Sequence, residues 1–200
     1  MIKLLILFLC ASVMADIKTS NPKNEKKNII PVVTNFVKIA KKNKKDKPVR
    51  FIPTRILVER LKTQDVAVII NTIKQIGKQD KGSKYVLKEF SKLLNHPYPS
   101  VREEILDAVF SFDVLKPLLP SLAKCLNDPV ESIRQDAADI IGDIETREMI
   151  NIFVCALTNK YPDVRENADF YLQFWTDEEF TNSVDWIKWW EKKKTTFVFD

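Results

Sequence analysis

The chain has 200 residues, among them only 3 glycines and 1 histidine. So few glycines argue against a β-rich or loop-rich fold. The net charge of +5 is unevenly divided, since residues 16–55 carry +9 and residues 56–200 carry −5. A basic arm therefore precedes an acidic body.

Residues 1–15 have the three-part pattern of a secretory signal peptide. One basic residue precedes an apolar stretch at 4–10, and small residues lead to a cleavage site after Ala15. A membrane anchor and a buried N-terminal helix are the alternatives, but the stretch falls short of the roughly 20 residues that cross a bilayer. Lipid attachment at Cys10 is disfavoured because Leu9 precedes it. We expect a periplasmic or secreted chain that begins at Asp16.

Residues 16–50 form the basic arm. Its first part, 16–27, is polar and without periodicity and is expected to be disordered. Residues 29–40 have an apolar face, which predicts a short helix after Pro31. The arm has three interpretations: a soluble linker, a weak contact with the anionic envelope surface, or a segment that folds back on the acidic body. Nucleic acid is not expected as a partner, because export separates the chain from it.

A repeated apolar pattern occupies residues 51–176. Leu61, Leu94, Leu126 and Leu157 stand 33, 32 and 31 residues apart. Three further columns keep this spacing: Leu57, Phe90, Leu122 and Phe153; Val68, Val101, Ile133 and Val164; Ile76, Val109, Ile141 and Leu172. A stack of similar helix pairs needs such columns, because each pair buries its open face against the next. The pattern predicts an all-α solenoid of about four helix pairs.

Each repeat is predicted to contain two helices joined by a turn. In the repeat led by Leu94, apolar residues recur at steps of three and four, which keeps them on one helical face. Pro99 suits the first turn of the second helix, where its missing N–H costs nothing. Ser100 and Glu103 have the spacing of a capping box.

The segment 128–138 reads Asp-Pro-Val-Glu-Ser-Ile-Arg-Gln-Asp-Ala-Ala. It resembles the signature of short HEAT-like repeats of the PBS-lyase type, and the Val-Arg step recurs at Arg102 and Arg165. The resemblance covers about 56–175. It implies an α-α superhelix (a HEAT-like solenoid) whose second helices line the concave surface.

The same resemblance implies ion pairs between repeats. In such repeats a turn aspartate six residues before the arginine often pairs with it across repeats, and Asp128 and Arg134 have this spacing. His96 and Asn159 stand at the aspartate position elsewhere, so a continuous Asp–Arg ladder is left open.

Residues 177–200 contain a tryptophan motif that includes Trp186. The motif resembles the Trp-x-x-Trp-Trp tail that often closes secreted bacterial HEAT-like proteins, and a helix with three tryptophans can cover the open face of an end repeat. An aromatic stripe leads into this capping helix and tail, and it is expected to fill core rather than to bind a peptide. The stripe consists of Phe170, Phe174, Trp175 and Phe180.

The outer faces of the second helices carry the candidate partner-binding residues. If the apolar columns face inwards, the acidic side chains between them face outwards. The candidates are Glu103, Asp107, Asp136, Asp139, Asp143, Glu166 and Phe170. An acidic groove of this kind would attract a basic protein or peptide. A solvated face without a partner is the alternative.

The sequence shows no reactive constellation. A zinc site needs about four ligands, and His96 has no second histidine or paired cysteines to join it. Phosphate-binding glycine loops, nucleophile elbows and HExxH are also absent from the sequence, so we expect no catalytic residue, metal or cofactor. Cys125 and Cys155 lie at non-equivalent positions, which favours two buried free thiols over a disulfide.

These features predict a non-catalytic protein-binding scaffold or adaptor in the cell envelope. The alternative is an enzyme accessory or a chromophore-lyase-like protein, since some relatives of these repeats act on bound cofactors.

Overall fold

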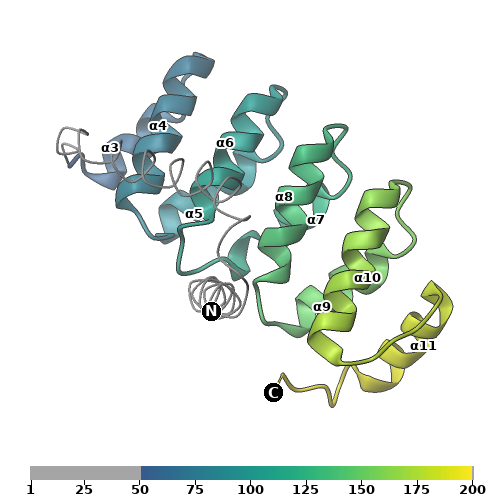
Figure 1. Ribbon diagram of the computed structural model, residues 1–200. Helices are drawn as coiled ribbons and strands as arrows, with labels where there is room; N and C mark the ends of the chain where they lie inside the picture. The colour runs from purple at the N-terminus through teal and green to yellow at the C-terminus, as the bar shows by residue number, and fades with distance from the viewer. Residues whose placement is uncertain (1–50, 200) are drawn as a thin grey trace, which may run out of the picture. The chain divides into compact units, whose positions relative to one another are not determined.

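The computed structural model describes residues 51–199, and all regular structure in that range is helical (Figure 1). The predicted signal peptide, basic arm and short helix after Pro31 lie outside the described residues. The elements are α3 (Thr54–Arg60), α4 (Val66–Gln79), α5 (Lys84–Leu93), α6 (Pro99–Val109), the 3-10 turn η1 (Lys116–Leu118), α7 (Leu119–Cys125), α8 (Glu131–Gly142), α9 (Arg147–Ala156), α10 (Pro162–Thr176) and α11 (Ser183–Lys193).

The helices stack as four pairs, as the repeated columns predict. The second helices α4, α6, α8 and α10 pack side by side in chain order, and the first helices α3, α5, α7 and α9 form the layer behind them (Figure 1). Each pair contacts its neighbours along the stack. The described part is therefore an all-α superhelix of the solenoid type.

Several helices begin at capping side chains. Asp65 Oδ1 accepts hydrogen bonds from the N–H groups of Ala67 and Val68 at the start of α4, and Thr146 caps α9 in the same manner. Pro99 and Pro162 lie in the first turns of α6 and α10, where the missing N–H has no intrahelical partner to lose.

The capping box predicted at Ser100 and Glu103 is wrong. The N-cap of α6 is Tyr98, and no side chain caps this helix. Because the helix starts before Ser100, the serine already lies inside its first turn. Glu103 instead accepts a hydrogen bond from Ser132 Oγ of α8 at 3.1 Å.

The predicted columns form one continuous core, with a single exception. The four leucines at the repeat period and the residues four before and fifteen after them are all buried. Val68 is the exception, with 40% of its surface exposed, while its neighbour Ile69 is buried. The prediction for Val68 is wrong because α4 is the first second helix of the described stack. No described second helix packs against its outer side.

Two glycines allow second helices to approach each other closely. A methyl group at Gly77 of α4 would lie 3.1 Å from Ala108 Cβ on α6. A methyl group at Gly142 of α8 would overlap the ring of Tyr171 on α10. Both glycines therefore make room for a side chain of the next repeat.

A buried ion pair links the second repeat to the third. Arg102 of α6 donates from Nε and Nη2 to the two carboxylate oxygens of Asp128, at 2.7 and 2.9 Å. Both side chains are 8% exposed. Arg102 Nη1 also donates to the carbonyls of His96 and Pro97 in its own turn. The guanidinium thus fastens its own turn to that of the next repeat.

A second ion pair links the third repeat to the fourth, but its aspartate, Asp163, is not the one that the resemblance indicates. Arg134 donates to the carbonyl of Asp128 and pairs with Asp163 Oδ2 at 2.7 Å, so Asp128 and Arg134 do not form an ion pair with each other. Burial opposes ionisation of Asp163, but the bonded arginine outweighs it and lowers the pKa of this carboxyl. Asp163 lies four residues beyond Asn159, inside the first turn of α10. The next repeat therefore supplies its carboxylate from the helix rather than from the turn.

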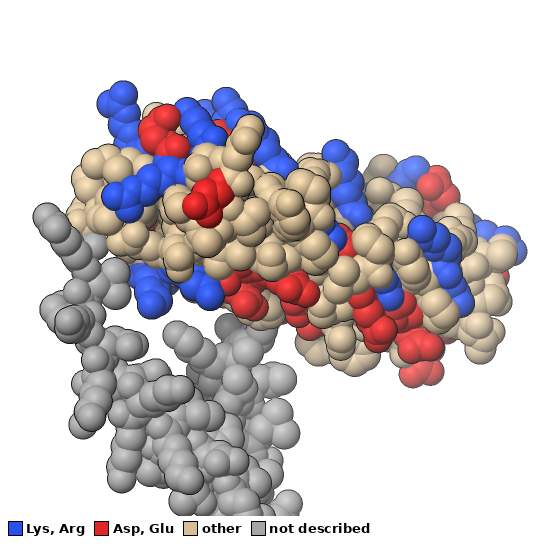
Figure 2. Space-filling view, turned by 90° about the horizontal axis from the view of Figure 1, so that it is seen from above, with Lys and Arg blue, Asp and Glu red and all other residues tan. Residues whose placement is uncertain are grey.

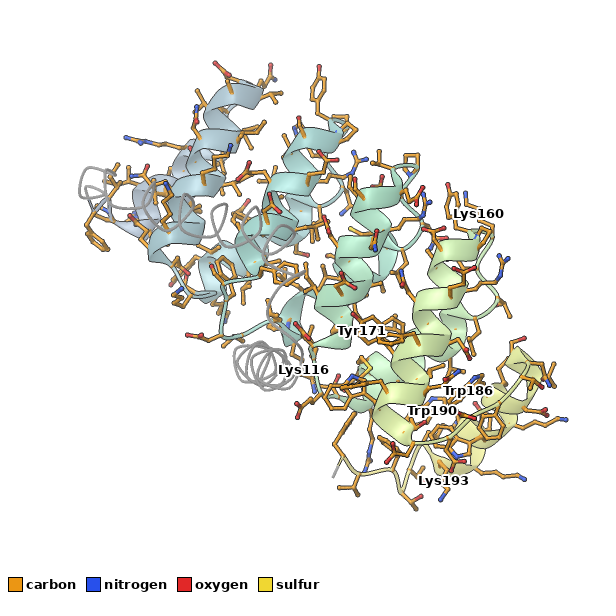
Figure 3. The ribbon with its side chains drawn as sticks, in the orientation of Figure 1. Lys116, Lys160, Tyr171, Trp186, Trp190 and Lys193 are labelled. Carbon is orange, nitrogen blue, oxygen red and sulfur yellow. The ribbon has the colours of Figure 1, made fainter. Side chains whose placement is uncertain are left out.

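The helix α11 covers the end of the stack by burying two tryptophans (Figure 3). Trp186 Nε1 donates to Asp169 Oδ1 of α10 at 2.8 Å, and Trp190 Nε1 donates to Asn151 Oδ1 of α9 at 3.2 Å. Each indole thereby buries its apolar body and satisfies its N–H group. The chain reverses towards α11 at Asp177, whose φ of 52° ends α10 in the left-handed region.

Cys125 and Cys155 are both free thiols, but only one of them is buried. Cys125 lies in the core, where burial raises the pKa of its thiol to about 11. Cys155 is exposed on α9, so the prediction that it is buried is wrong. Its position two residues before Leu157 places it on the outer side of the helix.

Candidate functional site

The second helices α6 and α8 present a group of carboxylates on their outer side, here called the acidic face. Its members are Glu103, Asp107, Asp136, Asp139 and Asp143. Figure 2 shows acidic side chains gathered along the edge formed by the second helices. Five of the seven sequence-predicted residues therefore share one surface.

The carboxylates of the acidic face are close enough to repel one another. Partial burial raises the pKa of Asp136 above its ordinary value, and the charges of Asp107, Asp139 and Glu103 raise it further. Burial and the charge of Asp139 raise the pKa of Asp143 in the same direction. A charge is disfavoured at both positions, because burial removes water and the neighbouring charges have the same sign.

No carboxylate of the acidic face forms an ion pair within residues 51–199. The nearby Glu104 differs, because Lys74 of α4 binds it at 3.2 Å. Two neutral donors of the described residues reach the acidic face: Ser132 Oγ donates to Glu103, and Tyr171 Oη donates to Asp139 at 2.8 Å. The repulsion on this surface is thus not compensated by a described cation.

Exposed aromatic rings adjoin the acidic face on α10. Phe170 and Phe174 are 61% and 59% exposed, and their rings stack with centroids 6.4 Å apart. Phe170 also contacts Tyr171 edge to face at 5.2 Å. Tyr171 therefore links Phe170 to Asp139, because its ring contacts Phe170 and its hydroxyl donates to Asp139. Apolar and anionic groups therefore stand side by side.

The core-filling interpretation of the aromatic stripe is wrong for Phe170 and Phe174. It holds for Trp175 and Phe180, which are half-buried against the core. Phe180 packs edge to face on Trp186 at 4.8 Å. The burial of the four residues differs because positions 170 and 174 lie on the side of α10 that faces solvent, whereas α11 covers the opposite side.

The remaining candidate, Glu166, is exposed on α10 and joins no ion pair in the described part of the chain. The charge of Glu166 does not contribute to the raised pKa values of Asp136 and Asp143. Sequence reasoning missed Tyr171, which bridges the acidic face and the aromatic pair. Gly142, one repeat earlier, was the signal in the sequence, because a glycine on α8 leaves room for the ring of Tyr171 on α10.

Two classes of site are not found in the residues described. No group of three or more His, Cys, Asp or Glu side chains within 51–199 is arranged to hold a metal ion. Over the same range, no helix combines the length and the apolar character needed to span a membrane.

Comparison with known proteins identifies one repeat unit. The family model for the HEAT repeat matches residues 118–145, which include α7 and α8. No curated protein matches the chain. HEAT repeats commonly mediate protein–protein interactions. The match in the third helix pair, together with the similar pairs stacked on both sides, supports a HEAT-like repeat protein with an all-α superhelical fold.

Proposed function

We propose that the protein is a non-catalytic scaffold or adaptor that binds a basic segment of a partner protein on its acidic face. The observation that carries the proposal is the set of five neighbouring carboxylates without an ion pair in residues 51–199, two of them with raised pKa values. A lysine or arginine on the partner would relieve this repulsion.

The aromatic pair of Phe170 and Phe174 supplies the apolar part of the interaction. An exposed ion pair contributes only about 0–1 kcal/mol, so charge alone gives weak binding. Burying apolar surface contributes about 25 cal/mol per Å². We therefore expect the partner segment to carry an apolar residue beside its lysines or arginines.

The proposal includes export to the cell envelope, for which the signal-like pattern of residues 1–15 is the support. Mass spectrometry of the intact native protein tests this part. A chain that begins at Asp16 agrees with it. Retention of residues 1–15, or a diacylglycerol adduct on Cys10, contradicts it.

Binding is tested with a lysine-rich peptide that contains one phenylalanine. Replacing Asp136 and Asp139 together by lysine should abolish binding, and 0.5 M salt should weaken it, because screening shortens the range of the charges. The matched control replaces Glu59 on α3 and Glu191 on α11 by lysine, an equal change in net charge away from the acidic face. Equal losses in both double variants would show that only net charge matters.

Binding should also depend on pH in a defined direction. Lysine binds the ionised carboxylates, and protonation of Asp136 and Asp143 removes that attraction. Because both pKa values are raised above 3.8, affinity should fall at a higher pH than for ordinary carboxyls as the solution is acidified. Asp136→Asn should shift this loss to lower pH. A pH profile that is unchanged in the variant would contradict the assignment.

The basic arm is proposed as an internal competitor for the acidic face. It carries the opposite charge, so deletion of residues 16–47 should strengthen peptide binding at low salt. Unchanged or weaker binding after deletion would leave the arm as a linker.

A further inference from the structure

Arg165, the last arginine of the ladder, has no carboxylate partner among the described residues. Arg102 and Arg134 each donate from Nη1 to two turn carbonyls and from Nε to a carboxylate of the next repeat at 2.7 Å. Arg165 makes the same turn contacts, with Asn159 O at 2.8 Å and Lys160 O at 3.2 Å. Its Nε and Nη2 form no hydrogen bond within residues 51–199. Arg165 therefore lacks, among the described residues, the carboxylate that Arg102 and Arg134 each bind.

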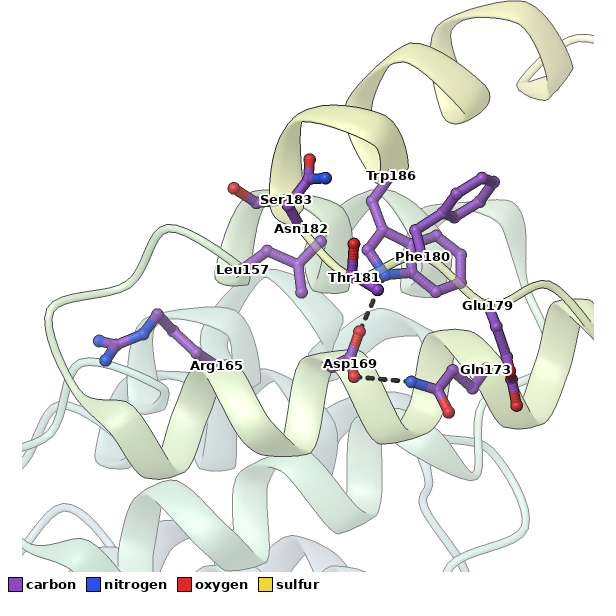
Figure 4. A pocket seen from close by; sticks show the side chains of 10 residues that line it. All are labelled: Leu157, Arg165, Asp169, Gln173, Glu179, Phe180, Thr181, Asn182, Ser183 and Trp186. Atoms are coloured by element: carbon purple, nitrogen blue, oxygen red, sulfur yellow. Dashed lines mark hydrogen bonds between the residues drawn. The ribbon is translucent and has the colours of Figure 1, made fainter.

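Arg165 borders a pocket of about 710 Å³ between α10 and the beginning of α11 (Figure 4). This volume lies within the range of small-molecule sites, about 300–1,000 Å³. Leu157, Phe180 and Trp186 line part of the pocket with apolar surface. Asn182 adds a polar group where α11 begins.

The charges in the pocket favour an anion at the arginine end only. Arg165 lies at one end and Glu179 at the other, with Asp169 between them (Figure 4). Both oxygens of Asp169 already accept hydrogen bonds, from Trp186 Nε1 and from Gln173 Nε2 at 2.7 Å. These donors offset part of its charge.

We propose that Arg165 and this pocket bind a carboxylate that carries a short apolar portion. The carboxylate would take the place that Asp128 and Asp163 take on the two preceding arginines, with the guanidinium donating from Nε and Nη2 in the fork geometry seen at Arg102. The apolar portion would lie against Leu157. The site is separate from the acidic face, and neither depends on the other.

Two probes distinguish the possible sources of the carboxylate. N-acetylglutamate represents a free small acid, and a blocked hexapeptide with one glutamate between leucines represents the side chain of a partner protein. Each is titrated into the full chain while the ¹⁵N–¹H signals of the arginine Nε–Hε groups and the tryptophan indoles are recorded. We expect shifts at Arg165 and Trp186, and none at the buried Arg102.

Three variants test the role of the guanidinium. Arg165→Gln should weaken binding at least about tenfold, the factor that one hydrogen bond to a charged group supplies. Arg165→Lys keeps the charge but loses the fork, and should also weaken binding. Lys160→Gln removes an equal charge from an exposed neighbour outside the pocket, and should change affinity less than twofold. Circular dichroism of each variant confirms that it is folded.

Each outcome of these titrations either identifies the source of the carboxylate or contradicts the site. Binding of N-acetylglutamate that is lost in Arg165→Gln supports a free acid as ligand, and binding of the peptide alone with the same loss supports a partner side chain. Absence of a shift at Arg165 with both probes overturns the site. Equal weakening by Lys160→Gln overturns it as well, because general charge would then explain the binding.

Discussion

Replacing Asp128 by alanine should destabilise the repeats by about 3–5 kcal/mol, the usual cost of stranding one partner of a buried ion pair. Asp128 holds Arg102 through two hydrogen bonds of 2.7 and 2.9 Å, and each side chain is only 8% exposed. Alanine would leave the guanidinium buried without a counter-charge. It would also remove the bond that Asp128 Oδ1 accepts from Val130 N at 2.9 Å.

Two comparisons make this prediction specific to burial. Asp163→Ala should cost less: Arg134 is as buried as Arg102, at 7% exposed, but the side chain of Asp163 is 26% exposed, so water can occupy the place that it leaves beside the arginine. The double variant Arg102→Met with Asp128→Leu should recover much of the loss, since well-packed apolar residues often replace a buried pair without cost.

Urea denaturation followed by circular dichroism at 222 nm measures the free energy of unfolding of each variant. For a domain of this size, each kcal/mol also lowers the melting temperature by about 2–4 °C. The reasoning is refuted if Asp128→Ala loses less than about 1 kcal/mol, or no more than Asp163→Ala, because the Arg102–Asp128 pair would then be accessible to water in solution.

Leu126→Ala should cost about 2–5 kcal/mol in the same assay, because Leu126 is 2% exposed between repeats; a loss under half a kcal/mol would disprove the register. Gly142→Ala should cost about 1–3 kcal/mol, since its methyl group would displace the ring of Tyr171, and an unchanged stability would contradict that close approach. A thiol reagent at neutral pH should label Cys155 in the native protein and Cys125 only after unfolding. Burial keeps Cys125 protonated, with a pKa of about 11; equal labelling rates would show that Cys125 is accessible.

The helical stack was predictable because the apolar residues that hold it together recur at a regular spacing in the sequence. The column of Leu61, Leu94, Leu126 and Leu157 reports the burial of one helix face at each period, and the structure confirms all four. Val68 belongs to an equally regular column but is exposed. Periodicity shows which face a residue lies on, whereas burial also needs a neighbouring helix, and none within residues 51–199 packs on the outer side of α4.

The contacts between repeats were harder to predict. The acidic face follows from the outward positions on α6 and α8, so its residues can be read from the sequence. Asp163 could not be chosen as the partner of Arg134, because its position depends on where α10 begins relative to the turn before it. The exposure of Phe170 and Phe174 depends on the direction of the turn at Asp177, which composition does not reveal.

The tryptophan helix at the C-terminal end has a consequence for self-association. Open-ended growth into a fibre requires two different complementary surfaces on every copy, so that each added subunit exposes a fresh acceptor. Trp186 and Trp190 occupy the surface of α9 and α10 that a further helix pair would use. A second copy therefore finds no acceptor for its first helix pair at this end. A further helix pair could stack on α9 and α10 only after α11 is displaced, so the two buried tryptophans oppose head-to-tail association through this end of the described stack.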